Sequence, residues 1–115
     1  MGEAPAILLI EDELRLRNNL QILLEGEGYK VTTACNGAEG IAKAKAESYD
    51  LVITDLVMPQ MSGREVVERL RANAPGVRVI CASGFVRNGS EEDETYLQKP
   101  FTSQDLLRKV KQAFN

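Results

Sequence analysis

The chain has 115 residues, which fits one compact domain, and 43% of them are hydrophobic, enough for a core but too few for a membrane protein. Its formal net charge of −3 argues against a nucleic-acid-binding module, because such modules carry a basic face. No apolar run approaches the roughly 20 residues of a membrane-spanning helix.

The N-terminal residues show no basic region and no cleavable signal, so we expect a cytoplasmic domain. Two cysteines, Cys35 and Cys81, are too few for a disulfide framework. Both adjoin apolar segments, and we expect both to be buried and reduced. Histidine is absent, so the chain has no imidazole on which to hold a phosphoryl group.

Apolar runs alternate with stretches of helical periodicity along the whole chain. The predicted elements, in chain order, are a strand at 6–10, a helix at 13–26, a strand at 30–34, a helix from 38, a strand at 51–54, a helix from 62, a strand at 77–82, a strand at 95–98 and a helix from 102. The first strand is apolar without interruption, as expected of a strand buried on both faces. Thr102 and Asp105 form a capping-box pattern at the start of the last helix.

Strands that alternate with helices imply an α/β fold, in which a parallel sheet is covered by helices on both faces. No internal repeat or interdomain linker interrupts residues 1–115, so we expect one domain.

Polar residues follow the predicted strands where each strand ends: Glu11 and Asp12, then Asp55, then Ser83, and finally Lys99 before Pro100. In an open parallel sheet, ligands bind at the carboxyl ends of the strands. We therefore expect these side chains to converge at one edge.

Three carboxylates at one edge would repel one another, and a hard divalent cation would offset that repulsion. Mg²⁺ prefers oxygen ligands and is commonly held by one or two carboxylates together with phosphate oxygens. Asp12 and Asp55 suit direct coordination, and Glu11 suits contact through a water. A lysine and a hydroxyl on the other side would meet an anion, which suits phosphoryl transfer to a carboxylate nucleophile.

Four segments together resemble the receiver domain of two-component response regulators: ILLIEDE at 7–13, ITDLVMPQMSG at 53–63, VICASGF at 79–85 and YLQKPF at 96–101. The resemblance covers nearly the whole chain. It implies a doubly wound, flavodoxin-like sheet of five parallel strands in the order 2-1-3-4-5.

The resemblance also assigns roles to individual residues. It implies a phosphoacceptor (Asp55), catalytic residues (Ser83, Lys99), switch residues (Ser83, Tyr96) and magnesium ligands (Glu11, Asp12, Asp55 and the backbone carbonyl of Val57). A cis bond is implied between Lys99 and Pro100. Many members of the family carry aspartate where this chain has Glu11.

One segment departs from the family pattern. Only 15 residues separate Ser83 from Lys99, and among them Asn88-Gly89 is a turn signal with few apolar neighbours. We therefore expect the fourth helix of the fold to be shortened or disordered. Response regulators commonly dimerise through that helix, so we expect a monomer in isolation. The short segment resembles receivers of hybrid histidine kinases, and the sequence leaves open whether the chain is part of one or stands alone.

The resemblance implies a phosphoacceptor regulator that catalyses only its own phosphorylation and dephosphorylation. Its partner would be a histidine kinase or a histidine phosphotransfer domain, with a kinase or output domain possible in a longer chain. One alternative is a phosphohydrolase of the haloacid dehalogenase type, but those enzymes need an acid where Val57 stands. A degenerate receiver that only binds partners is a second alternative. Flavin binding is disfavoured, because the chain has no Ser-, Thr- or Gly-rich phosphate-binding loop after the first strand.

Overall fold

The structure is a computed structural model that describes residues 4–58, 60–83 and 96–114. Its elements in chain order are β1 (Ala6–Ile10), α1 (Leu14–Gly26), β2 (Lys30–Ala34), α2 (Gly37–Ala46), β3 (Leu51–Asp55), α3 (Gly63–Asn73), β4 (Arg78–Ser83), β5 (Tyr96–Gln98) and α4 (Ser103–Ala113). The five strands form one sheet in the order β2-β1-β3-β4-β5, and each neighbouring pair is parallel. The predicted fold and strand order are confirmed. The prediction of a shortened or disordered fourth helix falls on residues 84–95, outside the described part of the chain.

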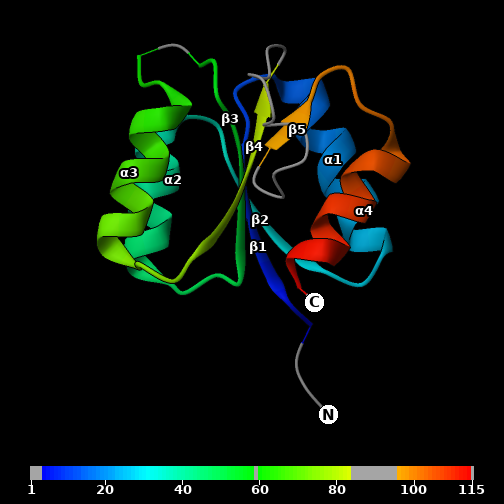
Figure 1. Cartoon of the computed structure of the whole chain (residues 1–115), viewed down its shortest axis with the longest axis horizontal. Helices are drawn as coiled ribbons and strands as arrows, with labels where there is room; N and C mark the ends of the chain where they lie inside the picture. The colour runs from blue at the N-terminus through cyan, green and yellow to red at the C-terminus, as the bar shows by residue number, and fades with distance from the viewer. Residues whose placement is uncertain (1–3, 59, 84–95, 115) are drawn as a thin grey trace.

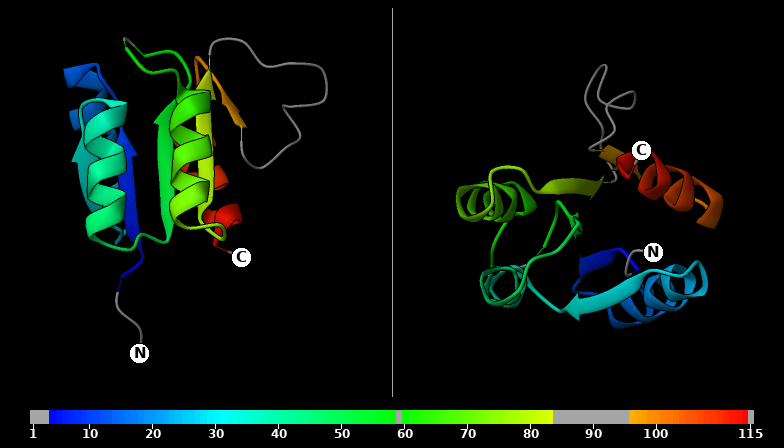
Figure 2. Two further views of the ribbon diagram at one scale, coloured as in Figure 1. Left: turned by 90° about the vertical axis from the view of Figure 1, so that its left-hand side faces the viewer. Right: turned by 90° about the horizontal axis from the view of Figure 1, so that it is seen from below.

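Helices cover both faces of the sheet, as Figure 1 shows, with α2 and α3 on one face and α1 and α4 on the other. The two rotated views in Figure 2 show the same three layers. The carboxyl ends of the strands lie toward the top of Figure 1. Among the described residues, the loops that follow the strands form that edge.

The side chains of β1 alternate between two hydrophobic cores, which explains why its sequence is apolar throughout. Ile7 and Leu9 pack with residues of α1 and α4, whereas Leu8 and Ile10 pack with residues of α2 and α3. All four are essentially inaccessible to solvent. Burial of each such side chain contributes roughly 1.5–3 kcal/mol, so the central strands are rigid supports for whatever follows them.

Each helix begins with a side chain that caps its free backbone N–H groups. The caps are Glu13 for α1, Asn36 for α2, Ser62 for α3 and Thr102 for α4. The predicted capping box at Thr102 is confirmed, because the Asp105 side chain also accepts from the Thr102 backbone N–H. These caps fix where α1, α2 and α3 leave the loops at the carboxyl edge.

The prediction for the cysteines is half right. Cys81 is buried in β4, but Cys35 is exposed. Cys35 comes one residue after the end of β2, beside the cap of α2, and the helices that cover the sheet do not cover this loop position. Within the described residues, none of the helices is both long enough and apolar enough to cross a membrane.

Candidate functional site

The register of the sheet aligns the ends of β1 and β3. Ile10 pairs with Thr54 on one side and with Ala34 of β2 on the other. The next residues along the chain, Glu11 just after β1 and Asp55 at the end of β3, therefore lie at the same level. The predicted convergence of these two acids is confirmed.

Three carboxylates form a cluster at this edge. Glu11, Asp12 and Asp55 each offer an oxygen, and these oxygens lie within 4.8 Å of one another. Glu11 and Asp55 are 4% and 8% exposed, whereas Asp12 is exposed. The cluster thus has a buried floor and opens to solvent on the side of Asp12.

Lys99 supplies positive charge to the cluster from the loop after β5. Its Nζ donates to Asp55 Oδ2 at 2.8 Å and lies 3.9 Å from Glu11 Oε1. The peptide bond from Lys99 to Pro100 is cis, as predicted. Burial by itself would lower the pKa of Lys99, but its hydrogen bond to Asp55 and the charges of the three acids raise that pKa above its ordinary value. Lys99 therefore carries a positive charge at neutral pH.

The buried floor changes the acidity of Glu11. Burial raises the pKa of its carboxyl to about 7, against the opposing effects of the Glu13 backbone N–H and the Lys99 charge. One lysine does not offset three neighbouring carboxylates. A cation with a higher charge would favour the ionised form of all three.

The donor set suits Mg²⁺. The described cluster consists of carboxylate oxygens, which Mg²⁺ prefers, and its open side leaves room for the waters and phosphate oxygens that usually complete the coordination. Nitrogen or sulfur ligands, which would favour zinc, are absent from this cluster. The residues present therefore fit the predicted cation.

The loop after β3 folds back tightly over Asp55. The Val57 backbone N–H donates to Asp55 Oδ1 at 3.2 Å, and the Gly63 backbone N–H donates to the Leu56 carbonyl at 2.9 Å. A Cβ on Gly63 would lie 2.4 Å from the Asp55 carbonyl oxygen, closer than real Cβ atoms come to such an atom. The Val57 side chain is 77% exposed and points away from the core, so its role here rests on its backbone.

Comparison with known proteins identifies the family. The sequence model of the family described as the response regulator receiver domain matches residues 7–111. This chain belongs to the response regulator receiver family. The transcriptional regulatory protein YkoG of Bacillus subtilis is 36% identical over 115 residues, which cover 93% of this chain and 50% of YkoG. The receiver thus spans about half the length of the curated relatives it matches.

Two solved structures resemble this receiver closely. Response regulator TrrA of Thermotoga maritima, solved in complex with Mg²⁺-BeF, has a TM-score of 0.82 and 33% identity, and the match covers 95% of this chain and 98% of TrrA. The receiver domain of hybrid histidine kinase CckA has a TM-score of 0.82 and 29% identity, with 96% and 99% covered. The chain is thus a receiver domain of two-component signalling.

The two predicted switch residues lie on β4 and β5, the strands that follow β3 in the sheet. Ser83 is the last residue of β4 and pairs with Gln98 of β5; its side chain lies outside the described part of the structure. Tyr96 begins β5, is half-buried and packs against the core beneath α2 and α3.

Arg17 was not singled out in the sequence. Its guanidinium donates from Nη1 to the backbone carbonyl of Glu11 at 2.9 Å. Side chains of a helix lean toward its N-terminus, so a long residue one turn inside α1 can reach the loop that precedes the helix. That spacing, six residues after Glu11, was the available signal.

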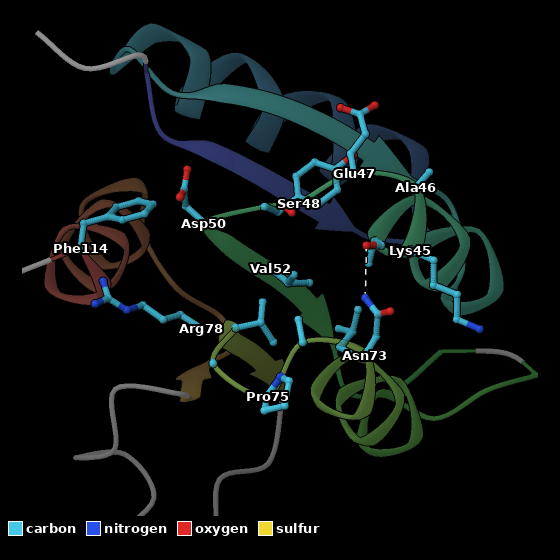
Figure 3. A pocket seen from close by; sticks show the side chains of 16 residues that line it. Lys45, Ala46, Glu47, Ser48, Asp50, Val52, Asn73, Pro75, Arg78 and Phe114 are labelled. Atoms are coloured by element: carbon cyan, nitrogen blue, oxygen red, sulfur yellow. Dashed lines mark hydrogen bonds between the residues drawn. The ribbon is translucent and has the colours of Figure 1, made fainter.

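A crevice of about 670 Å³ lies at the opposite end of the receiver sheet, among the residues shown in Figure 3. Its polar groups hold elements together. Asn73 donates to the Ala44 carbonyl, Arg78 donates to the Ala113 carbonyl, and Asp50 accepts from the backbone N–H of Ala6. The crevice is therefore a junction of the fold, remote from the carboxylate cluster.

Proposed function

We propose that residues 1–115 form a single receiver domain that accepts a phosphoryl group on Asp55. The donor would be a phosphohistidine of a histidine kinase or a histidine phosphotransfer domain. The observation that carries the proposal is the buried Asp55 carboxylate, which has two other carboxylates within 4.8 Å and Lys99 Nζ at 2.8 Å.

The reaction would be a substitution at phosphorus. An Asp55 carboxylate oxygen forms a bond to phosphorus while the phosphorus–nitrogen bond breaks, and the electron pair of that bond stays on the departing imidazole. Lys99, already beside Asp55, would bind an oxygen of the transferred group, and Ser83 would donate a hydrogen bond to another. The contribution of these residues is positioning and charge neutralisation, on which phosphoryl transfer mainly depends.

Glu11, Asp12, Asp55 and the backbone carbonyl of Val57 would hold Mg²⁺ at this site. The bound ion would supply neutralisation of the negative charge shared by the carboxylates and the incoming phosphoryl group.

Phosphorylation would then shift an equilibrium between two conformations. Movement of Ser83 toward the phosphoryl group would leave space that Tyr96 fills, and the half-buried position of Tyr96 is compatible with such a change. The readers of the switch would be partner proteins, or a kinase or output domain of a longer chain. In isolation we expect a monomer.

The direct test is intact mass after incubation with Mg²⁺ and acetyl phosphate. We expect the parent to gain one phosphoryl group only when Mg²⁺ is present, and Asp55→Asn to gain none. Asp50→Asn is the matched control, because Asp50 lies at the amino end of β3 and an asparagine can still accept from Ala6 N. This control should be phosphorylated as the parent is.

A missing adduct would have two explanations, and a beryllofluoride titration followed by fluorine NMR separates them. Bound beryllofluoride on the parent, absent from Asp55→Asn, would mean that the site is competent but its phosphoryl group is short-lived. The absence of both the phosphoryl adduct and beryllofluoride binding would contradict the proposal and would favour a degenerate receiver.

A further inference from the structure

Two of the three clustered acids sit on the short loop between β1 and α1. Glu11 and Asp12 are consecutive, so the peptide group that joins them sets the directions in which both side chains leave the backbone. Whatever holds that peptide group therefore determines whether the carboxylates stand ready for a cation.

Hydrogen bonds hold both peptide groups beside Glu11. Its backbone N–H donates to the Ala34 carbonyl at the end of β2, at 3.0 Å. Its backbone carbonyl, which belongs to the peptide group shared with Asp12, accepts from Arg17 Nη1 at 2.9 Å. The first contact continues the sheet, whereas the second comes from a side chain on α1. Arg17 is half-buried, and its own backbone N–H donates to the Glu13 carbonyl at 2.9 Å.

The hydrogen bond from Arg17 to the Glu11 carbonyl opposes the electrostatic repulsion within the cluster. Without a divalent cation, three carboxylates in one cluster repel one another, and this repulsion favours displacement of the loop that carries Glu11 and Asp12 away from Asp55. A hydrogen bond from a charged donor is stronger than one between neutral groups. Arg17 is therefore well suited to keep the loop closed while the cluster is still without its cation.

The Arg17 guanidinium contacts the backbone of the loop, at the Glu11 carbonyl. Lys99, by contrast, contacts the carboxylates themselves. The two cations thus contact different groups, the carboxylates in the case of Lys99 and the backbone carbonyl of Glu11 in the case of Arg17.

We propose that Arg17 is a positioning residue for the cation site, which acts by fixing the peptide group between Glu11 and Asp12. The inference rests on the proposed function, because it takes the cluster to be a Mg²⁺ site. Mutation of a residue that hydrogen-bonds a metal ligand, without binding the metal itself, commonly lowers metal affinity by roughly 10- to 100-fold. We expect Arg17 to fall at about the lower limit of that range.

The sign of the effect separates positioning from simple electrostatics. Loss of a positive charge near a cation site reduces repulsion of the cation and should tighten Mg²⁺ binding. Loss of a positioning contact should weaken it. Arg15 provides the matched control, because it lies in the same turn of α1, is exposed, and makes no side-chain hydrogen bond or ion pair among the described residues.

The experiment is calorimetric titration of the metal-free protein with Mg²⁺. We expect the Kd of Arg17→Met to rise about tenfold over the parent, and the Kd of Arg15→Met to stay equal or fall slightly. Arg17→Lys, which keeps a charged donor, should lie between the parent and Arg17→Met. If Arg17→Met does not fold, Arg17→Gln carries the same test, since it is neutral and its side chain is shorter.

Amide hydrogen exchange without metal gives a second readout. In Arg17→Met the Glu11 amide should exchange faster than in the parent, while the Ile80 amide in the centre of β4 should not change. A Kd equal to or below that of the parent would overturn the inference, as would equal acceleration at Ile80, which would mark a general loss of stability. If the parent itself binds no Mg²⁺, the proposed function fails first and this inference fails with it.

Discussion

Lys99 and Asp55 form the closest oppositely charged pair of the site. The burial of the pair determines how much it contributes to the stability of the fold. The Lys99 side chain is 29% exposed and that of Asp55 is 9% exposed, so the pair is screened less than a surface pair. Removal of one partner would leave the other in a poorly solvated position beside Glu11. We therefore expect the pair to stabilise the metal-free receiver.

Lys99→Met should lower the free energy of unfolding by about 3 kcal/mol without Mg²⁺, because it leaves a buried carboxylate unpaired. Added Mg²⁺ should recover part of that loss, while the phosphoryl adduct forms much more slowly than in the parent. Urea unfolding with and without Mg²⁺, together with the mass assay, checks both parts. Stability equal to the parent in metal-free buffer would contradict this account.

Glu39, outside the carboxylate cluster, carries a charge whose contacts contribute to the stability of the fold. Its Oε1 accepts from the Cys35 backbone N–H at 2.6 Å, and its Oε2 lies 3.1 Å from Lys43 Nζ. The contacts with Cys35, followed by that with Lys43, lower the pKa of Glu39 to about 2. Since the folded pKa is below the ordinary value of 4.5, the ionised side chain stabilises the fold above pH 4.5, and this contribution is lost as the pH falls toward 2.

Glu39→Gln should therefore lower the free energy of unfolding by about 1 kcal/mol at pH 7, a value reduced for the solvent exposure of the pair. The difference from the parent should shrink as the pH falls below 4.5. Urea unfolding at pH 7, 4 and 3 measures it. The control is Glu68→Gln, at an exposed position of α3, which should show a small difference at every pH. The same pH dependence in both variants would refute the assignment.

At the scale of elements, the site depends on how closely α3 returns to the end of β3. Gly63 is the first residue of α3, and any Cβ there would meet the backbone of Asp55 and Leu56 at 2.4 Å. Backbone cannot rotate aside as a flexible side chain can. The loop that carries Val57 must therefore shift if the glycine is replaced.

Gly63→Ala should lower the free energy of unfolding by roughly 1–3 kcal/mol, as overpacking does, and should reduce phosphorylation through displacement of the loop. Gly26→Ala is the matched control, because a Cβ at Gly26 meets nothing within 4 Å at the end of α1. That substitution should be neutral or stabilising by up to about 1 kcal/mol. Urea unfolding and the mass assay apply to both variants, and phosphorylation of Gly63→Ala at the parental rate would count against the argument.

At the scale of the whole molecule, the cluster links cation binding to folding. Glu11 and Asp12 follow β1 whereas Asp55 ends β3, and the chain brings them together only when the sheet is formed. A cation that binds this cluster binds the folded chain and not the unfolded one, so it must stabilise the fold by mass action.

Mg²⁺ at ten times its Kd should raise the free energy of unfolding by about 1.4 kcal/mol. Asp12→Asn should lose most of this gain, since it removes one ligand at the exposed side of the cluster. Asp50→Asn, the same substitution at the other end of β3, should keep it. The measurement is urea unfolding at several Mg²⁺ concentrations, and an equal gain in all three proteins would show that the ion acts elsewhere.

The sequence by itself determined the order of strands and helices and the edge at which the site lies. Continuous apolar strands and helical periodicity report burial of near neighbours in the chain, and in a parallel sheet every strand ends at the same edge. The acids at the ends of β1 and β3 and the lysine after β5 could therefore be assigned to one place without coordinates.

Only the tertiary structure decided the distances and the burial. The raised pKa of Glu11, the 2.8 Å contact from Lys99 to Asp55 and the exposure of Cys35 depend on strand register and on which loops stay uncovered. The contact from Arg17 to Glu11 depends on how α1 leaves its loop. A sequence pattern specifies which face of an element is buried, but the approach of two side chains from different elements is set by how those elements pack.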